Sequence, residues 1–251
     1  MQKYKMIVAY DGTDYFGWQK QKDIPTVAQT LEDRFFCVFG KKISVFGASR
    51  TDAGVHALGQ VAQFVVDIQI KAETMLQAWN NILPPDIVIK YIESVPSTYH
   101  LHSGIKEKTY HYHFFLNRPL PGVHRHVWFF QYPVDIEKLK KALQVFEGTH
   151  DFRSFCTGDE REDTVRTITA TSVEFIEHFG CYRIIIRGPK FLRYMIRRIV
   201  GACLEVASRE FLSVDCLQEA LEKKDPQQTL PKSPAKGLVL KEIVYHETLQ
   251  G

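Results

Sequence analysis

The stretch GASRTDAGVHALGQVAQF, from Gly47 to Phe64, is the part of this chain from which fold and chemistry are most readily predicted. Within it, Asp52 lies two residues after Arg50 and two residues before Gly54. Apolar, β-type sequence lies on both sides, so we expect a strand, a sharp turn and a second strand. Such a turn would hold the Asp52 carboxylate rigidly at the edge of a sheet. An acid fixed beside a cation is what covalent or acid–base catalysis requires.

Around this motif, hydrophobic periodicity predicts the element order β-α-β-β-α-β for residues 1–100. The expected strands are Tyr4–Tyr10, Lys41–Gly47, Gly59–Val66 and Asp86–Ile92. A first helix begins at Thr26, because Thr26 and Gln29 form a capping-box pattern ahead of an apolar stripe at helical spacing. A second helix carries Met75, Trp79 and Ile82, and it stops at Pro84–Pro85. This order is that of a ferredoxin-like unit.

Residues 101–251 repeat that order of elements without a repeat of sequence. The expected strands are Lys108–Leu116, Thr167–Phe175, Tyr182–Ile186 and Leu238–Val244. The expected helices are Ile136–Phe146 and Phe191–Val206, with a short additional helix at Phe211–Leu221. The segments predicted to be irregular are Pro119–Pro133, Asp159–Asp163 and Thr229–Lys236. We therefore expect an α+β fold whose two ferredoxin-like halves, residues 1–100 and 101–251, pair their sheets and leave a central cleft.

Composition and charge narrow the class of protein. With 251 residues, 45% of them apolar, the chain can bury a sizeable core. Its net charge of +3 argues against a uniformly basic nucleic-acid binder. One stretch without any acidic residue nevertheless carries six basic ones: Arg183, Arg187, Lys190, Arg193, Arg197 and Arg198. A phosphate backbone would suit this stretch, and the alternative is a solvated helix face.

Cysteine and histidine usage bears on metals and on compartment. The five cysteines are scattered without a CxxC pair, which indicates neither a zinc knuckle nor a disulfide framework. No apolar run reaches transmembrane length, so we expect a soluble, cytoplasmic chain. Six of the ten histidines lie between His100 and His126, and His111 and His113 would share one face of a strand. That clustering leaves a histidine-bound metal as a competing hypothesis.

The octapeptide RTDAGVHA, at Arg50–Ala57, resembles the hallmark motif of the TruA-type tRNA pseudouridine synthases. Further segments are similar to motifs of that family, in the same order: Tyr10–Thr13 with Gly17–Gln19, Asn80–Ile87, Lys108–Tyr112, His150–Phe155, Phe191–Gly201 and Lys236–Leu238. The resemblance extends from about Tyr10 to Leu240, almost the whole chain. Ser49 and His102 depart from the family pattern near the expected RNA path.

This resemblance implies two RRM-like halves that share one mostly antiparallel sheet, with helices packed on one face. It also implies conversion of uridine to pseudouridine at positions 38, 39 and 40 of the tRNA anticodon stem-loop. Asp52 falls at the family's catalytic aspartate, and we expect it to act as a nucleophile. Tyr110 matches the tyrosine that lies against the target base, and Arg197 matches the arginine of the family's helix motif. A guanidinium within about 4–6 Å would keep Asp52 ionised.

We expect no cofactor and no metal, because this isomerisation needs neither a redox change nor a group donor. The expected partners are tRNA and, as is usual in the family, a second copy of the chain. The residues that we expect to contact RNA are Arg50, Arg187, Lys190, Arg193 and Arg198. Gly12, Gly17 and Trp18 are better suited to shaping a loop than to touching substrate. His56 either braces that loop or touches RNA.

Two other functions remain open from the residues alone. The chain could be a non-catalytic RNA-binding protein that keeps the fold, because a lone aspartate in a turn is usually an Asx-turn residue. In that case Tyr110 is an ordinary strand aromatic, and Arg197 extends past apolar neighbours to solvent. The chain could also be a histidine-metal hydrolase, although no cysteine or carboxylate is placed to complete a site with His111 and His113.

Overall fold

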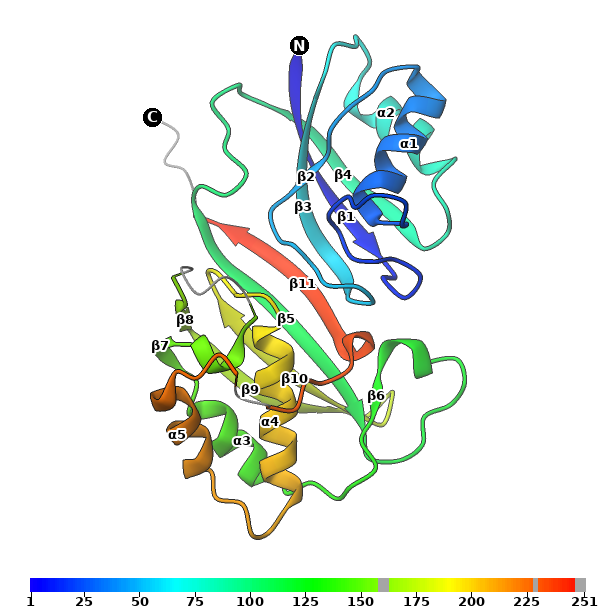
Figure 1. The fold of residues 1–251 in the computed structure, drawn as a ribbon. Helices are drawn as coiled ribbons and strands as arrows, with labels where there is room; N and C mark the ends of the chain where they lie inside the picture. Colours follow the sequence, from blue (N-terminus) through cyan, green and yellow to red (C-terminus); the bar gives the residue numbers. More distant parts are fainter. Residues whose placement is uncertain (158–162, 228–229, 247–251) are drawn as a thin grey trace. The chain divides into compact units, whose positions relative to one another are not determined.

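The computed structural model describes residues 1–157, 163–227 and 230–246 (Figure 1). The chain divides into two compact units, one formed by residues 1–105 with residues 239–251 and the other by residues 106–238. The final strand, which the sequence analysis assigns to the C-terminal half, groups with the first unit. The predicted loops Asp159–Asp163 and Thr229–Lys236 lie partly outside the described residues.

The first unit contains an open, mostly antiparallel sheet. Its strands are β1 (Gln2–Tyr10), β2 (Phe46–Gly47), β3 (His56–Val66), β4 (Ile87–Val95) and β11 (Leu238–Tyr245). The order across the sheet is β4-β1-β3-β11, and β2 pairs with β3 as well. β1 runs antiparallel to both β3 and β4, whereas β11 pairs with β3 in parallel through Val239 opposite His56.

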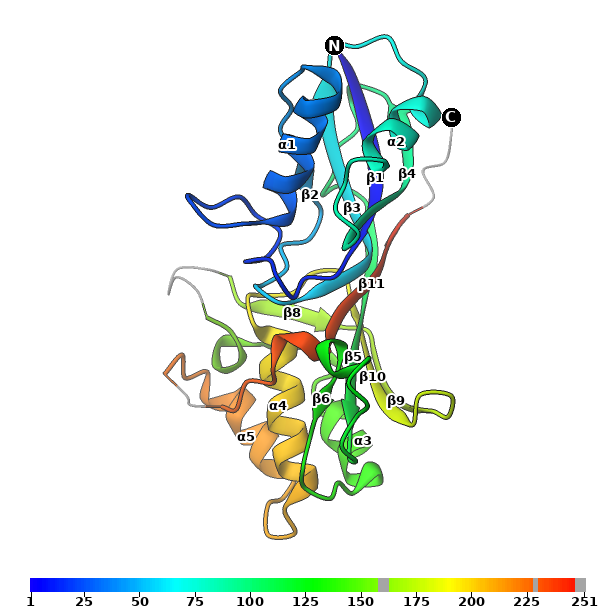
Figure 2. The ribbon, with the colours of Figure 1, turned by 90° about the vertical axis from the view of Figure 1, so that its right-hand side faces the viewer.

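Two helices, α1 (Val27–Phe39) and α2 (Ala72–Asn80), cover one face of this sheet (Figures 1 and 2). The rings of Phe35 on α1, Trp79 on α2 and Phe64 on β3 pack against one another, with centroids 4.8 to 5.7 Å apart. All three side chains are buried, and they form the core of the unit. The predicted start of α1 is confirmed, because the Thr26 side chain accepts a hydrogen bond from the Gln29 backbone N–H.

Two elements predicted for the first unit are shorter in the structure than expected. The strand expected at Lys41–Gly47 forms only at Phe46–Gly47. The backbone N–H of Val45 donates instead to the buried Glu32 carboxylate, at 2.8 Å, so this part of the chain is held by α1 rather than by a neighbouring strand. The second helix ends at Asn80, and Ile82 follows in a turn whose N–H donates to the Trp79 carbonyl.

The second unit contains three long antiparallel strands and most of the helices. These strands have the order β5 (Ile105–Phe115), β10 (Cys181–Gly188) and β9 (Ala170–Ile176), and the short β6 (Trp128–Phe129) lies parallel to β5. The strands β7 (Gly148–Asp151) and β8 (Val165–Ile168) form a separate pair. The helices are α3 (Ile136–Gln144), α4 (Met195–Ser208) and α5 (Asp215–Lys223), with 3-10 turns η1 (His124–His126), η2 (Arg153–Phe155) and η3 (Ala235–Gly237).

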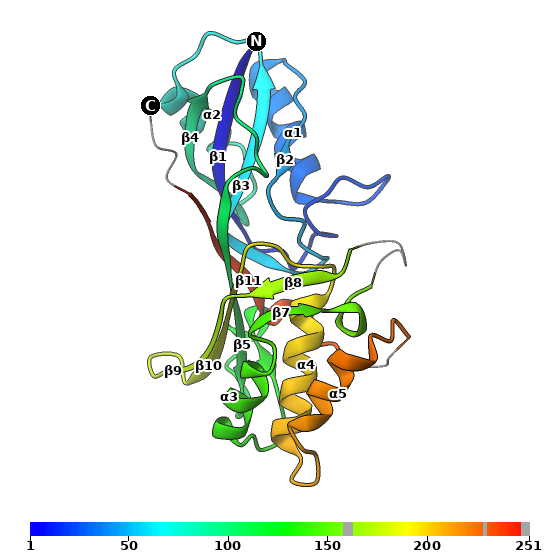
Figure 3. The ribbon, with the colours of Figure 1, turned by 90° about the vertical axis from the view of Figure 1, so that its left-hand side faces the viewer.

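The three α-helices of this unit lie side by side on one face of the sheet (Figures 2 and 3). α3 packs on both α4 and β9, and α5 packs on η2. The helix α4 supplies eleven buried residues, which makes it the central helix of the unit. The apolar stripe that predicts this helix is therefore a core-facing surface, as its hydrophobic spacing indicates.

Several predictions for the second unit also differ from the structure. The additional helix expected at Phe211–Leu221 is α5, at Asp215–Lys223, and the segment Pro119–Pro133, expected to be irregular, contains η1 and β6. The single strand expected at Thr167–Phe175 is divided into β8 and β9. At the junction the N–H of Thr169 donates to the Arg187 backbone carbonyl at 2.8 Å, and before it β8 pairs with β7 instead of with β10. The helix expected from Phe191 begins only at Met195, because Tyr194 has the left-handed conformation, with φ at 62°, and so cannot continue a right-handed helix.

No helix within the described residues is both long enough and apolar enough to cross a membrane.

Candidate active site

Asp52 lies on the tight connection between β2 and β3 in the first unit. The turn closes through a hydrogen bond from the Val55 N–H to the Asp52 carbonyl at 3.1 Å, and Gly54 adopts a φ of 76° that favours glycine. The preceding residue is fixed as well, because the Thr51 hydroxyl is 2.8 Å from the Tyr10 hydroxyl. Asp52 itself is half-buried. The predicted rigid turn that carries one acid is therefore present.

The Tyr10–Gln19 loop packs directly against this turn. A Cβ atom on Gly12 would lie 2.0 Å from the Val55 carbonyl oxygen, and one on Gly17 would lie 2.5 Å from the Thr51 carbonyl oxygen. The N–H of Trp18 donates to that same Thr51 carbonyl at 3.2 Å. These contacts support a role for the two glycines in shaping the loop, since only residues without a side chain allow so close an approach, and Trp18 contributes through its backbone N–H.

His56 supports the packing of the Tyr10–Gln19 loop against the Asp52 turn from inside the protein. Its Nδ1 atom accepts a hydrogen bond from the Gly12 backbone N–H at 3.0 Å and lies 3.0 Å from an Asp11 carboxylate oxygen. Only 4% of the residue is exposed. Of the two roles considered for His56, the structure thus supports bracing the loop.

The Asn80–Ile87 segment also has a structural role. The side-chain amide of Asn80 donates to the Ile89 carbonyl at 2.8 Å, and its oxygen accepts the Ile89 N–H at 2.9 Å. Asp86 accepts a hydrogen bond from the Tyr15 hydroxyl at 2.9 Å, and its backbone carbonyl accepts the Asp11 N–H. These bonds connect the end of α2 and the start of β4 to the loop that supports Asp52.

Tyr110 lies on β5 in the second unit, opposite Ile186 of β10. Its ring meets the ring of Phe191 edge to face, with centroids 5.3 Å apart and an interplanar angle of 83°. The residue is 6% exposed. Packing of this kind fixes the plane of the tyrosine ring, as stacking on a base would require.

Lys108 is a buried lysine two residues before Tyr110 on the same strand. Side chains two apart on a strand point to the same side of the sheet, so Lys108 shares a face with Tyr110. Burial, assisted by the charge of Lys190, lowers the pKa of Lys108 from its ordinary value of 10.5 to about 8. A buried lysine with a shifted pKa beside a proposed substrate-binding residue is a candidate functional group.

Arg197 lies in the first turn of α4, with its guanidinium held inside the protein. Its Nε atom donates to the Ser233 carbonyl at 2.8 Å, and the Ser233 N–H donates to the Arg197 carbonyl at 3.0 Å. The residue is 9% exposed. The side chain therefore does not extend to solvent, and its position is set by the segment that passes over α4.

The remaining basic residues do not form one helix face. Arg187, Lys190 and Arg193 are exposed and lie on β10 or on the segment before α4. Arg198 lies on α4, where it donates to the Thr157 hydroxyl at 3.2 Å. Arg183 faces Glu174 at 3.6 Å, so its charge is partly neutralised.

The predicted site residues are divided between the two compact units. Asp52 and the exposed Arg50 belong to the first unit. The second unit carries Tyr110, Arg197, Arg187, Lys190, Arg193 and Arg198.

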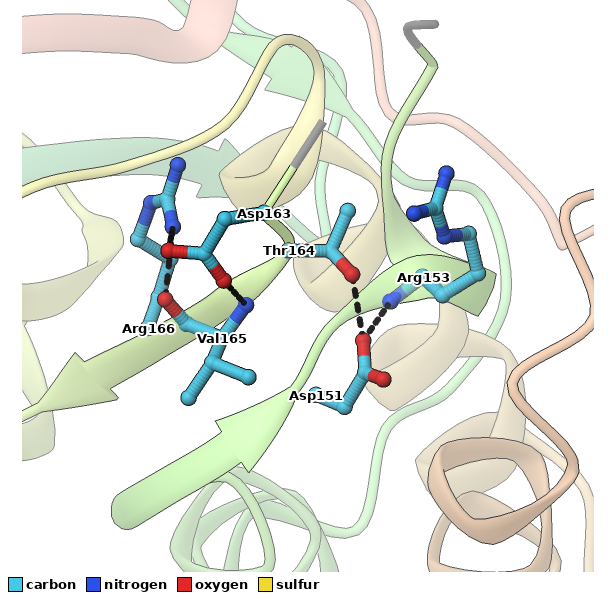
Figure 4. Close-up of polar contacts among 6 residues, drawn as sticks. All are labelled: Asp151, Arg153, Asp163, Thr164, Val165 and Arg166. Carbon is cyan, nitrogen blue, oxygen red and sulfur yellow. Dashed lines mark hydrogen bonds and ion pairs between the residues drawn. The ribbon is translucent and has the colours of Figure 1, made fainter. Parts of the chain in front are cut away.

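The His150–Phe155 segment also acts as a scaffold (Figure 4). The Asp151 carboxylate accepts hydrogen bonds from the Thr164 hydroxyl at 2.5 Å and from the Arg153 N–H at 3.1 Å. Partial burial alone would raise the pKa of Asp151, but these bonds and the charges of Lys224 and Arg153 outweigh it and hold the pKa below its ordinary range. Together with the buried Phe152, this network anchors η2 beneath α4.

His111 and His113 face each other on β5, as predicted, with ring centroids 6.0 Å apart. The Nε2 atom of His113 accepts a hydrogen bond from Arg183 at 3.1 Å, so it is engaged in a structural contact. In the described part of the chain, neither histidine belongs to a group of three metal-ligating side chains. The metal hypothesis thus finds no support at these residues.

Sequence reasoning did not single out three residues that the structure brings to notice: Lys108, Tyr194 and Lys232. The burial of Lys108 depends on the packing of β5, which no local pattern reveals. Lys232 meets the Tyr194 ring from a segment more than thirty residues away in the sequence. The only signal in the sequence is that all three lie in or near the motifs quoted above.

The family model described as tRNA pseudouridine synthase matches residues 6–102 and 142–246. The tRNA pseudouridine synthase A of Thermoanaerobacter sp. (strain X514) is 38% identical, over 98% of this chain and 100% of the relative. Those of Thermotoga neapolitana and Thermodesulfovibrio yellowstonii are 36% and 32% identical, with the same coverage.

A chain from the crystal structure of a Cbf5-Nop10-Gar1 complex has a TM-score of 0.36 and 13% identity, and the match covers 80% of this chain and 45% of that one. This likeness is too weak to support an argument. The family match spans both compact units, and the full-length relatives agree with it. The chain therefore belongs to the tRNA pseudouridine synthase family.

Proposed function

We propose that this chain converts uridine to pseudouridine at positions 38, 39 and 40 of the tRNA anticodon stem-loop, with Asp52 as the nucleophile and without a cofactor. Membership of the family supports the reaction and the substrate. The observation that carries the assignment of Asp52 is the turn itself. It holds one half-buried acid in the RTDAGVHA motif, braced from behind by Gly12, Gly17 and His56.

The reaction rearranges one nucleoside and needs no other reactant. The bond between C1′ of the ribose and N1 of uracil breaks, and a bond between C1′ and C5 forms. N1 gains a proton, and C5 loses its proton to solvent. A carboxylate can assist by attacking C1′ or by taking a proton from the sugar, and either route requires Asp52 to be ionised. We favour attack on the sugar, which makes Asp52 the nucleophile.

We propose that Arg197 keeps Asp52 ionised and that Tyr110 contacts the target base. An arginine held by a backbone carbonyl has a fixed position, so it can act on a carboxylate without losing side-chain entropy at that moment. Tyr110 can stack on uracil, and its hydroxyl can take part in proton transfer at C5. Both roles require Arg197 and Tyr110 of the second unit to lie close to Asp52 of the first unit. This proximity is part of what we propose.

We further propose that Arg50, Arg187, Lys190, Arg193 and Arg198 bind the RNA backbone. The target base must leave its stack to reach Asp52, which costs a few kcal/mol. Contacts to phosphate and 2′-hydroxyl groups offset that cost without reading sequence. The exposure of Arg50, Arg187, Lys190 and Arg193 is consistent with this role.

For the fold, we propose two ferredoxin-like halves that share a mostly antiparallel sheet around a central cleft, with the aspartate loop in residues 1–100 and the tyrosine and arginine in residues 101–251. The order β4-β1-β3, flanked by two helices on one face, supports this for the first half. We also propose that the enzyme is a homodimer and acts in the cytoplasm, where tRNA is modified.

Release of tritium from a tRNA transcript labelled at C5 of uridine tests this proposal, because C5 loses its hydrogen only when the new bond forms. We expect release from transcripts with uridine at positions 38 to 40 and none when those uridines are replaced. A non-catalytic RNA-binding protein would bind the transcript and release no tritium. A metal hydrolase would lose activity on chelation, whereas we expect chelators of divalent metals to leave the release unchanged when the transcript is kept folded with spermidine.

A further inference from the structure

Tyr194 stands at the centre of three cations in the second unit. The Lys232 ammonium lies 4.2 Å from the centroid of its ring, the Arg193 guanidinium carbon 4.8 Å and the Arg197 guanidinium carbon 5.6 Å. Arg193 also donates a hydrogen bond to the Tyr194 hydroxyl at 3.0 Å. One half-buried aromatic ring thus gathers positive charge from α4 and from a segment far along the chain.

Lys232 is held in this position by the docking of its neighbours on α4. A Cβ atom on Gly201 would lie 2.2 Å from the Pro231 carbonyl oxygen, so the close approach of this segment requires glycine in the helix. On the other side of Lys232, Ser233 exchanges two hydrogen bonds with Arg197. The lysine backbone is therefore fixed at both ends, and only its side chain is free to reorient.

Arg193 and Lys232 place two positive charges on one ring. These like charges repel each other, and the ring face offsets only part of that repulsion. Among the residues that the structure describes, no carboxylate forms an ion pair with Arg193 or Lys232. Both side chains are exposed, so their N–H donors are accessible to a ligand.

We infer that Arg193 and Lys232, held on the Tyr194 ring, form a binding subsite for a backbone phosphate of the RNA substrate. The inference rests on the proposed function in that the substrate is RNA, and it adds Tyr194 and Lys232 to the RNA contacts. A phosphodiester accepts hydrogen bonds from a guanidinium fork and an ammonium at the same time. The ring limits where the two cations can lie, so less side-chain entropy is lost on binding.

The test is the salt dependence of tRNA binding, measured by fluorescence anisotropy with an unmodified transcript between 50 and 300 mM KCl. The variants are Arg193→Met and Lys232→Met, which keep most of the side-chain length without the charge. The matched control is Lys223→Met, because Lys223 is an exposed lysine of the same unit at the end of α5. Removing one cation from a phosphate lowers the slope of log Kd against log salt by about 0.7–0.9.

We expect that change for each of the two variants, a rise in Kd of about three- to tenfold at 100 mM salt, and no change for the control. Single-turnover tritium release by the wild-type enzyme is measured beside these titrations, because it tests the proposed function separately from the subsite. If both variants keep the wild-type slope, the subsite is rejected. If the variants keep the wild-type slope and the wild-type enzyme releases tritium, only the subsite is rejected. If the variants have a lower slope but the wild-type enzyme releases no tritium, only the proposed function is rejected.

Substitution of Tyr194 is an independent test of the inference, because it removes no charge. Tyr194→Phe keeps the face that holds the cations, so we expect a slope within error of wild type. Tyr194→Ala releases both cations, and we expect a slope reduced toward that of Lys232→Met. Equal slopes for Tyr194→Ala and wild type would show that the ring does not organise the subsite, and would overturn the inference.

Discussion

Gly12 and Val55 approach so closely that a Cβ atom on residue 12 would lie 2.0 Å from the Val55 carbonyl oxygen. This contact joins two separate sequence motifs, and it fixes the backbone three residues after Asp52. The position of the acid therefore depends on the absence of a side chain forty residues earlier in the chain.

Gly12→Ala should disturb this contact directly. Because the clash is with backbone rather than with a flexible side chain, the turn at Asp52 must shift. We expect the free energy of unfolding to fall by about 1–3 kcal/mol. We also expect product formation to fall at least tenfold, since a catalytic group displaced by about 1 Å loses much of its effect.

Denaturant unfolding and single-turnover tritium release measure the two effects. The control is Gly122→Ala, because nothing lies near a Cβ at that position. If the two variants behave alike, the Gly12 contact does not support the site.

Lys108→Met should change how stability depends on pH. The pKa of Lys108 lies at about 8 in the folded protein and near 10.5 when unfolded, so between these values the unfolded chain binds a proton that the folded protein does not. Wild-type unfolding free energy therefore contains a Lys108 contribution that rises with pH from about 8 to 10.5. The variant lacks this contribution.

We expect Lys108→Met to be the more stable protein at pH 7, by an amount on the order of 3 kcal/mol at most, which corresponds to the shift of about 2.5 units from 10.5 to 8. The advantage should shrink as the pH rises to 10. Urea unfolding of both proteins at pH 7, 8, 9 and 10 measures it, and other titrating groups cancel in the difference. A difference that does not vary with pH would mean that Lys108 is not charged and buried in the folded state.

We also expect the more stable variant to make product more slowly, because Lys108 shares a face of β5 with Tyr110.

Asp151→Asn should destabilise the protein near neutral pH. The pKa of Asp151 is held below its ordinary value of 3.8, so the carboxylate contributes stability that is present above that value and lost as the pH falls through the folded pKa. We expect a loss of about 1–2 kcal/mol at pH 7, because a charged acceptor of two hydrogen bonds is replaced by a neutral amide.

That loss should shrink as the pH falls through the folded pKa of Asp151, because the wild-type carboxyl then becomes protonated as well. Asp67→Asn is the control, because the Asp67 side chain is 81% exposed and the substitution should change stability only slightly. Urea unfolding of the three proteins between pH 3 and pH 7 makes the comparison. A deficit that does not shrink at all as the pH falls would contradict the account of this network.

The sequence patterns predict most of the elements because hydrophobic spacing and caps act locally. The start of α1 at Thr26 follows from a cap that involves residues three apart. The errors occur where distant contacts decide the local structure. Val45 leaves the strand because of Glu32, and the start of α4 is delayed because Tyr194 takes up a left-handed conformation that no local pattern requires.

The site shows the same division between local and distant causes. The turn at Asp52 could be predicted, since Gly54 and the flanking apolar runs are adjacent to it in sequence. The cluster of Arg193, Tyr194 and Lys232 could not, because it depends on the docking of residues 231–233 against Gly201. The family motifs at Asn80 and Asp151 give no indication of their purpose in sequence, and the structure shows that both hold the scaffold together.

The most direct test of the central claim is pseudouridine formation by Asp52→Asn, with tRNA binding measured on the same preparation. The amide has nearly the shape of the acid and cannot act as a nucleophile or a base. We therefore expect tRNA bound with an affinity within about threefold of wild type, and no pseudouridine after many wild-type turnover times. Pseudouridine formed by the variant at the wild-type rate would show that Asp52 does not carry out the chemistry.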